Sequence, residues 1–246
     1  MLFKADLSGA DLRDADLSLC NAANCVAEDA DLRGAKLDDA YFHQANLSRA
    51  RLEGAIGTFA SFTEAKMQFV RASGVRFDQS EFSQADVSNA DFSRGFLTRC
   101  KFLETNGRGT IFESTTLDHS SFMDADLEGA RLREAQGKRT IWMRAKLASA
   151  NFGRCFLRSS QFDGISAKGA IFRGADVRDS RFYKAILEDA SFVQSNLFGV
   201  DLCETKLDRA DFTRANMYEA KLLGAKGNGT RFDGANLTRA LFQEAR

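Results

Sequence analysis

One register of mostly large apolar side chains runs through the chain at every fifth residue, from Leu2 to Phe242, without an insertion or deletion. Of its 49 positions, 41 hold Leu, Phe, Met, Val or Trp and eight hold Gly or Ala. A period of five matches neither the 3.6-residue period of an amphipathic helix nor the two-residue alternation of a strand. The register therefore predicts a solenoid, in which repeated segments stack into a rod.

The residues around each register position follow a common pattern: Ala, then Asp or Asn, then Leu or Phe, then two variable residues. The pattern is plain at residues 5–9, 45–49, 210–214 and 235–239. On these residues the chain resembles the pentapeptide repeat family, over practically its whole length. The resemblance implies a right-handed, four-sided β-helix in which four pentapeptides make one coil of 20 residues, with the central Leu or Phe and the small residue pointing inward.

A second periodicity appears when the register is sorted into four columns with a spacing of 20. Of 16 register phenylalanines, 15 belong to the columns that begin at residues 2 and 12, and only Phe77 departs from them. Leu is typical of the columns that begin at residues 7 and 17. We therefore predict an all-β solenoid, a right-handed quadrilateral β-helix of about 12 coils with Phe on two opposite sides and Leu on the other two. At about 4.8 Å per coil the rod would be roughly 60 Å long.

Four register positions hold glycine, at Gly57, Gly107, Gly137 and Gly227. They could mark clefts that bind a ligand, or places where the backbone changes locally because the large side chain is missing. We favour the local backbone change.

Composition and motifs point away from catalysis. The 34 basic and 34 acidic residues cancel, and no apolar stretch approaches the roughly 18 residues of a membrane span. No secretory signal, metal-ligand spacing, phosphate loop or nucleophile motif is present, and His43 and His119 fall on different sides. We expect one domain over residues 1–246, possibly a segment of a longer protein. It should lack catalytic residues, metal and cofactor and be cytoplasmic, although a secreted effector stays open.

Two outward strips are candidate partner-binding surfaces. The basic strip lies on the side whose register begins at residue 17, and it could be a docking face for an acidic partner or, as we favour, an ordinary charged wall. Its members are Arg99, His119, Lys138, Arg139, Arg158 and Arg178, followed by Phe198 and Tyr218. The apolar strip lies on the side that begins at residue 2, and exposed apolar residues in one line are typical of protein contact. It comprises Leu103, Met123, Met143, Tyr183 and Leu223, with Ile141 beside them.

The leading hypothesis is a non-catalytic scaffold for protein–protein interaction that presents side-chain columns to a partner of unknown identity. One alternative comes from the resemblance: some family members protect DNA gyrase by imitating duplex DNA, which calls for a strongly negative surface that a net charge of zero does not supply. Another is the repeat domain of a bacterial effector or secretion accessory protein. We expect no nucleic-acid partner. Because no capping helix precedes Leu2 or follows Phe242, end-to-end pairing of two copies or flanking domains are also expected.

Overall fold

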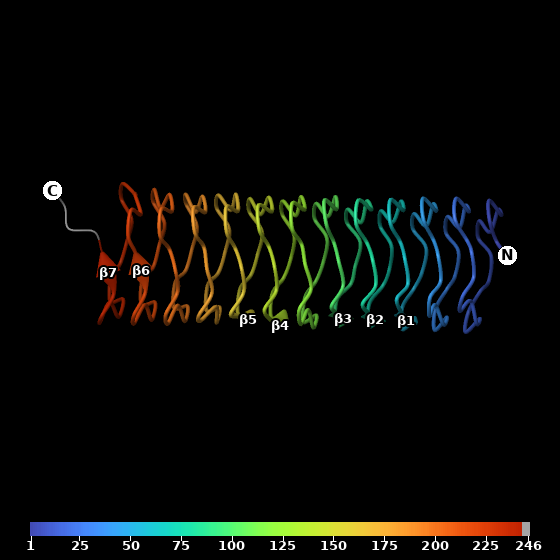
Figure 1. Ribbon diagram of the computed structural model, residues 1–246, viewed down its shortest axis with the longest axis horizontal. Coiled ribbons are helices and arrows are strands. Elements are labelled where there is room, and N and C mark those ends of the chain that lie inside the picture. The colour runs from blue at the N-terminus through green and yellow to red at the C-terminus, as the bar shows by residue number, and fades with distance from the viewer. Residues whose placement is uncertain (243–246) are drawn as a thin grey trace.

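The computed structural model describes residues 1–242, which form one long rod of stacked coils (Figure 1). Each coil pairs with the next through parallel β-bridges between residues twenty apart, such as Asp6 with Val26 and Val26 with Asn46. No helix occurs among the described residues. The structure is therefore the parallel β-helix that the five-residue register predicts.

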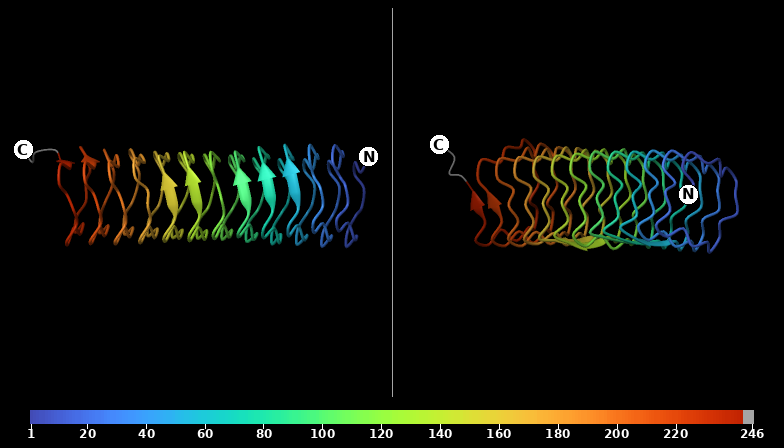
Figure 2. Two further views of the ribbon diagram at one scale, coloured as in Figure 1. Left: turned by 90° about the horizontal axis from the view of Figure 1, so that it is seen from below. Right: turned by 45° about the vertical axis from the view of Figure 1, so that its right-hand side comes forward.

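Five of the seven short strands lie along one side of the rod (Figure 2, left). They form a three-stranded sheet of β1 (Ile56–Thr58), β2 (Arg76–Asp78) and β3 (Phe96–Thr98), and a pair of β4 (Gln136–Lys138) and β5 (Phe156–Arg158). The remaining pair is β6 (Lys221–Leu222) with β7 (Leu241–Phe242). We call the side that carries β1 to β5, with the register residues from Leu17 to Leu237, the strand side.

The backbone of each repeat uses four of its five N–H groups in a fixed scheme. The N–H of Ala10 closes a β-turn to the carbonyl of Leu7 at 2.9 Å. Leu7 itself donates to the Val26 carbonyl of the next coil at 2.6 Å, and Val26 donates back to Ala5 at 2.9 Å. Gly9, the third residue of the turn, donates to the next coil at 2.8 Å and has the positive φ that a type II turn requires.

The fifth N–H explains why Asp or Asn precedes the register residue so often. It belongs to the residue after the register position, and the side chain two residues earlier accepts its hydrogen bond. The N–H of Ser8 donates to Asp6 Oδ1 at 3.0 Å, and the N–H of Ser48 donates to Asn46 Oδ1 at 3.1 Å. The acidic or amide residue thus completes the hydrogen bonding of the repeat, which an apolar residue at that position cannot do.

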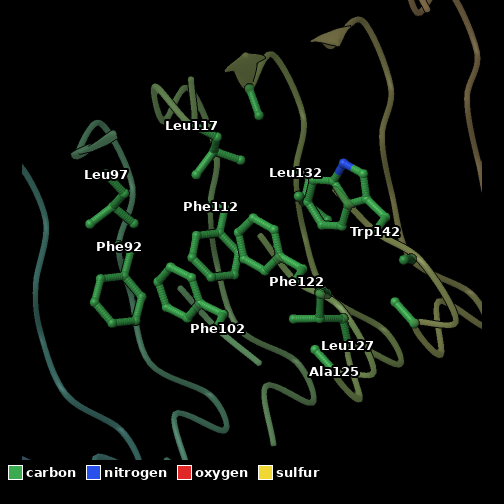
Figure 3. Packing of buried hydrophobic residues seen from close by; sticks show 14 of the residues in the cluster. Phe92, Leu97, Phe102, Phe112, Leu117, Phe122, Ala125, Leu127, Leu132 and Trp142 are labelled. Carbon is green, nitrogen blue, oxygen red and sulfur yellow. The ribbon is translucent and has the colours of Figure 1, made fainter. Parts of the chain in front are cut away.

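Aromatic rings stack along the interior (Figure 3). Within one column, the ring centroids of Phe82 and Phe102 lie 4.6 Å apart, and those of Phe102 and Phe122 lie 4.8 Å apart, with nearly parallel planes. Rings of the second aromatic column meet them edge to face, as Phe112 meets Phe102 at 5.7 Å and 84°. All of these rings are buried, and each such pair adds about 0.5–1.5 kcal/mol beyond the burial of its surface.

Two of the four register glycines coincide with the local backbone change that we favoured. Gly57 lies in β1 and Gly137 in β4, whereas Gly107 and Gly227 lie outside the strands. A Cβ on Gly57 would lie 3.2 Å from Cδ1 of Phe77, so the Phe77 ring occupies the interior space that Gly57 leaves. This contact explains why Phe77 departs from the two phenylalanine columns.

At Gly137 a neighbouring threonine occupies the corresponding space. A Cβ on Gly137 would lie 2.9 Å from the methyl group of Thr140. The Thr140 hydroxyl accepts a hydrogen bond from Nε1 of Trp142 at 2.7 Å, which satisfies the indole inside the rod. The interior is thus filled by side chains at both Gly57 and Gly137, and neither is an internal cleft.

Candidate protein-binding side

Large apolar side chains gather on the outside of the strand side. Ile56, Phe96 and Phe156 directly precede register residues and are 36%, 46% and 51% exposed, and Phe59 at the adjoining corner is 53% exposed. The first three replace the Asp or Asn that is usual before a register residue. The candidate strips did not include these four residues, although this departure from the repeat pattern is visible in the sequence.

A hollow of about 420 Å³ lies over β1, β2 and β3, and we call it the strand-side hollow. Gly57 and Phe77 form its floor. One wall is formed by Ile56, Arg76 and Phe96, and the Arg76 guanidinium lies over the Phe96 ring, 4.9 Å from its centroid. This cation–π contact holds an exposed ring beside the hollow.

The opposite wall of the strand-side hollow carries two aspartates. Asp38 Oδ1 accepts a hydrogen bond from the backbone N–H of Thr58 at 2.8 Å. Asp78 accepts hydrogen bonds from the Thr98 hydroxyl, at 2.5 Å, and from the Arg99 guanidinium. Burial acts to raise the pKa of Asp78, but the hydrogen bonds from Arg99 and Thr98 outweigh it and leave that pKa below its usual value. This wall is therefore polar, and Asp78 stays ionised beside Arg99.

The basic strip occupies the same strand side, but carboxylates partly neutralise it. Arg99 pairs with Asp78. Arg158 and Arg178 share Asp176, at 2.7 Å and 2.9 Å. Within residues 1–242, Lys138, Arg139 and His119 take part in no ion pair, so Lys138 and Arg139 hold the unneutralised charge of the strip.

Asp176 is the most buried of these carboxylates, at 8% exposure. Burial acts to raise its pKa, but the hydrogen bonds from Arg178 and Arg158 outweigh that effect and lower it. Asp176 therefore stays ionised and holds the two guanidiniums against the rod.

Stacked side chains continue the strand side beyond the basic strip. The rings of Phe198 and Tyr218 lie parallel, with centroids 5.6 Å apart, as expected for outward residues twenty apart. Beside them, the side-chain amide of Asn216 donates to Asn196 Oδ1 at 3.1 Å. Both rings are half-buried, so they contribute apolar area to a surface that is otherwise polar.

The apolar strip lies on the neighbouring side and is less exposed than its composition suggests. Only Leu223 is exposed; the other members, Leu103, Met123, Met143, Tyr183 and Ile141, are half-buried. The Tyr183 hydroxyl donates to Glu204 Oε1 at 2.9 Å, and Asp163 stands between Met143 and Tyr183 in the same column. Burial raises the pKa of Asp163. Polar groups therefore interrupt this strip.

Within residues 1–242, no three His, Cys, Asp or Glu side chains come close enough together to hold a metal ion. Cys100 and Cys155 are buried, and burial raises the pKa of both thiols, that of Cys100 to about 12. Cys203 is half-buried, and its pKa is also raised by burial. These thiols pack as small apolar groups.

Comparison with known families decides the classification. The family model described as pentapeptide repeats matches residues 2–39, 35–68, 60–99, 120–158, 143–182, 160–197 and 195–226. The chain is a pentapeptide repeat protein. This match confirms the resemblance seen in the sequence, and the fold of the family is a right-handed quadrilateral β-helix.

Solved structures of several pentapeptide repeat proteins are similar to this one. HetL, involved in heterocyst differentiation regulation in Nostoc sp. strain PCC 7120, is 20% identical with a TM-score of 0.28, over 95% of this chain and 90% of HetL. QnrB1, a plasmid-mediated fluoroquinolone resistance protein, is 14% identical with a TM-score of 0.40, over 77% of this chain and 94% of QnrB1. Function does not follow from likeness at this level.

A pentapeptide repeat protein from the Arabidopsis thaliana thylakoid lumen is 27% identical with a TM-score of 0.22, over 42% of this chain and 66% of its own. Among curated proteins, none matches the chain. The part of the chain that the structure describes contains no helix of the length and apolarity needed to cross a membrane.

Proposed function

We propose that this pentapeptide repeat protein is a non-catalytic scaffold that binds a protein partner through the strand side. The observation that carries the proposal is the gathering of Ile56, Phe59, Phe96 and Phe156 on the outside of that side, where Ile56 and Phe96 line the strand-side hollow. Exposed apolar groups beside a concave surface are typical of protein contact sites, where buried aromatic anchors supply most of the affinity.

The backbone of the strand side supports this role because it is preorganised. β1, β2 and β3 pair in register, with Gly57 beside Phe77 and Phe77 beside Leu97, and neighbouring coils therefore present their side chains about 4.8 Å apart. A surface that is already ordered loses little conformational entropy when it binds.

The chemistry of the strand side suggests which groups of a partner it would accept. An apolar or aromatic side chain would fit the strand-side hollow along the wall of Ile56, Arg76 and Phe96. A donor or cation would meet Asp38 on the opposite wall. Acidic groups of the same partner would meet Lys138 and Arg139 further along the rod. The basic strip then belongs to the same contact surface as the exposed phenylalanines.

Paired aspartate substitutions test the proposal with partners captured from a cell extract. Phe96→Asp with Phe156→Asp should abolish capture of partners that the unaltered chain retains. The matched control is Val26→Asp with Tyr41→Asp, which changes exposed apolar residues at the same repeat position on two other sides. Asp is a usual residue there, so both variants should fold. If the strand-side variant captures the same partners as the control, the strand side is not the contact surface.

A supercoiling assay with DNA gyrase and a quinolone separates this proposal from DNA mimicry. We expect no protection at micromolar concentration, because the surface charges balance and the strand side carries unneutralised cations. Protection of gyrase would favour the mimic hypothesis over a docking surface built on exposed phenylalanines.

A further inference from the structure

A second hollow, on a different side of the rod, is surrounded by arginines and belongs to neither strip. It has a volume of about 330 Å³ and lies over Gly153, which is buried because it has no side chain to project outward. Arg133 and Arg173 occupy the same outward column, one coil before and one coil after Gly153, and Arg154 follows Gly153 in the chain. We call this the arginine hollow.

The guanidiniums of Arg133, Arg154 and Arg173 are little neutralised by neighbouring carboxylates. Many other arginines of the rod lie against carboxylates at short range, as Arg144 does with Asp124 at 2.6 Å. Within residues 1–242, neither Arg154 nor Arg173 has a carboxylate within 4.0 Å, and the one carboxylate near Arg133 is Glu134, at 3.9 Å. The lining of the hollow contains no acidic residue. Three arginines thus line one concave space, and among the described residues Glu134 is the one carboxylate within 4.0 Å of any of them.

The floor and the remaining wall fit an anionic group attached to an organic one. The N–H of Gly153 already donates to Asn151 Oδ1 at 2.9 Å, so the floor offers no free backbone donor. The guanidiniums therefore supply the hydrogen-bond donors for a ligand. Arg133 and Arg173 are two coils apart, about 10 Å along the axis, which lets their side chains approach one anion from opposite sides. Ile171, 40% exposed, adds an apolar wall on which an organic substituent could rest.

We propose that Arg133, Arg154 and Arg173 bind a phosphate monoester over Gly153. A phosphate monoester carries close to two negative charges and three acceptor oxygens at neutral pH, whereas a carboxylate carries one charge and two oxygens. Planar guanidinium forks bind such oxygens in pairs. The ester could belong to a small metabolite or to a phosphorylated residue of a protein, and the chemistry of recognition is the same for both.

Isothermal titration at low salt tests the site with four probes: inorganic phosphate, glycerol 3-phosphate, a peptide that contains one phosphoserine, and the same peptide with Glu in its place. Binding by glycerol 3-phosphate and by the peptide supports the monoester, and binding by the peptide alone assigns the source to a phosphorylated protein. The proposal is overturned if none of the probes binds. It is also overturned if a peptide with Glu in place of phosphoserine binds equally well.

Three variants separate the site from general electrostatic attraction. Replacing Arg133, Arg154 and Arg173 by Gln should weaken binding about tenfold or more, whereas replacing Arg49, Arg144 and Arg209 removes the same charge from paired positions and should change it less than about twofold. Gly153→Leu keeps every charge, fills the hollow, and should also weaken binding about tenfold. Equal losses in the two arginine variants, or unchanged binding by Gly153→Leu, would rule out a built site.

Discussion

The strand-side hollow and the arginine hollow both lie over a glycine, but the two glycines leave out different side chains. Gly57 stands at a register position and lacks an inward side chain, and the Phe77 ring fills the interior space beside it. Gly153 stands at an outward position and lacks a surface side chain, so the space stays open between Arg133 and Arg173. Only in the arginine hollow does one missing outward side chain open the space, and there the residues twenty positions before and after it, Arg133 and Arg173, supply the charge.

This difference implies that stability is sensitive at the first hollow and insensitive at the second. The strand-side hollow rests on packing that continues into the interior, whereas the arginine hollow is only a gap between surface side chains. The following changes test that contrast, in order of decreasing effect.

Phe77→Ala should have the largest effect. Phe77 is fully buried and contacts the rings of Phe62 and Phe82, with centroids 5.6 Å and 5.9 Å away. Since Gly57 beside it cannot fill a cavity, we expect a loss of about 3–5 kcal/mol in the free energy of unfolding, measured by urea denaturation. A loss below about 1 kcal/mol would show that the Phe77 ring does not support the floor of the hollow.

Gly57→Leu should cost about 1–3 kcal/mol by overpacking, because its Cβ would already lie 3.2 Å from both Phe77 and Leu37. The double variant Gly57→Leu with Phe77→Leu redistributes the volume and should recover part of that loss. Denaturation of the single and double variants gives the coupling energy between the two positions. Strictly additive losses would mean that the Phe77 ring does not occupy the space left by Gly57.

Asp78 should make the strand side sensitive to acid. Its pKa is lowered in the folded protein, so its interactions stabilise the fold above about pH 4, the ordinary pKa of Asp, and this stabilisation is lost as the pH falls through the folded-state pKa. Asp78→Asn should therefore destabilise the protein by about 0.2–1 kcal/mol at pH 6 and by less at pH 3. Thermal unfolding of both proteins at pH 6 and pH 3 measures this loss of stability. An equal loss at the two pH values would contradict the prediction.

Gly153→Leu should have the smallest effect on stability, within about 0.5 kcal/mol. Its φ is not in the left-handed region, and Val193 in the same outward column shows that a branched side chain is tolerated there. The tightest contact of a Cβ at this position is Asn151 Oδ1 at 3.0 Å, an atom of a surface side chain that can shift by a few tenths of an ångström. The melting temperature should stay within a degree or two of the unaltered chain. A large drop in the melting temperature would mean that the packing requires a glycine at position 153, as it does at position 57.

The architecture could be predicted from the sequence because the requirement for buried apolar residues at fixed positions repeats in every coil. A register residue such as Phe102 meets Phe82 and Phe122 in the neighbouring coils, and sorting by twenty is enough to find them. The backbone scheme was not foreseen: the role of Asp6 as acceptor for the Ser8 N–H follows from turn geometry, which composition does not show. The role of the four register glycines, as ligand clefts or as places of local backbone change, also depends on geometry that composition does not show.

The candidate sites were harder to predict because they depend on exposure and pairing. Arg158 and Arg178 looked like free charge in the sequence, but Asp176 lies before Arg178 on the same side and pairs with both. Met123 and Met143 looked exposed and are half-buried. Phe96 and Phe156 could have been found by asking which outward positions depart from the repeat pattern.

The bridges between residues twenty apart have a consequence for how the two hollows could work together. Each coil contacts only its neighbours, so thermodynamic coupling between Gly57 and Gly153 must pass through about four intervening coils, over a separation of roughly 23 Å along the axis. The same ladder of parallel β-bridges joins all of those coils, and it keeps the distance between the two hollows constant. Ligands bound in the two hollows would be held at a set spacing, and each would have little effect on the affinity of the other hollow for its ligand. The rod would thus fix the distance between two bound partners.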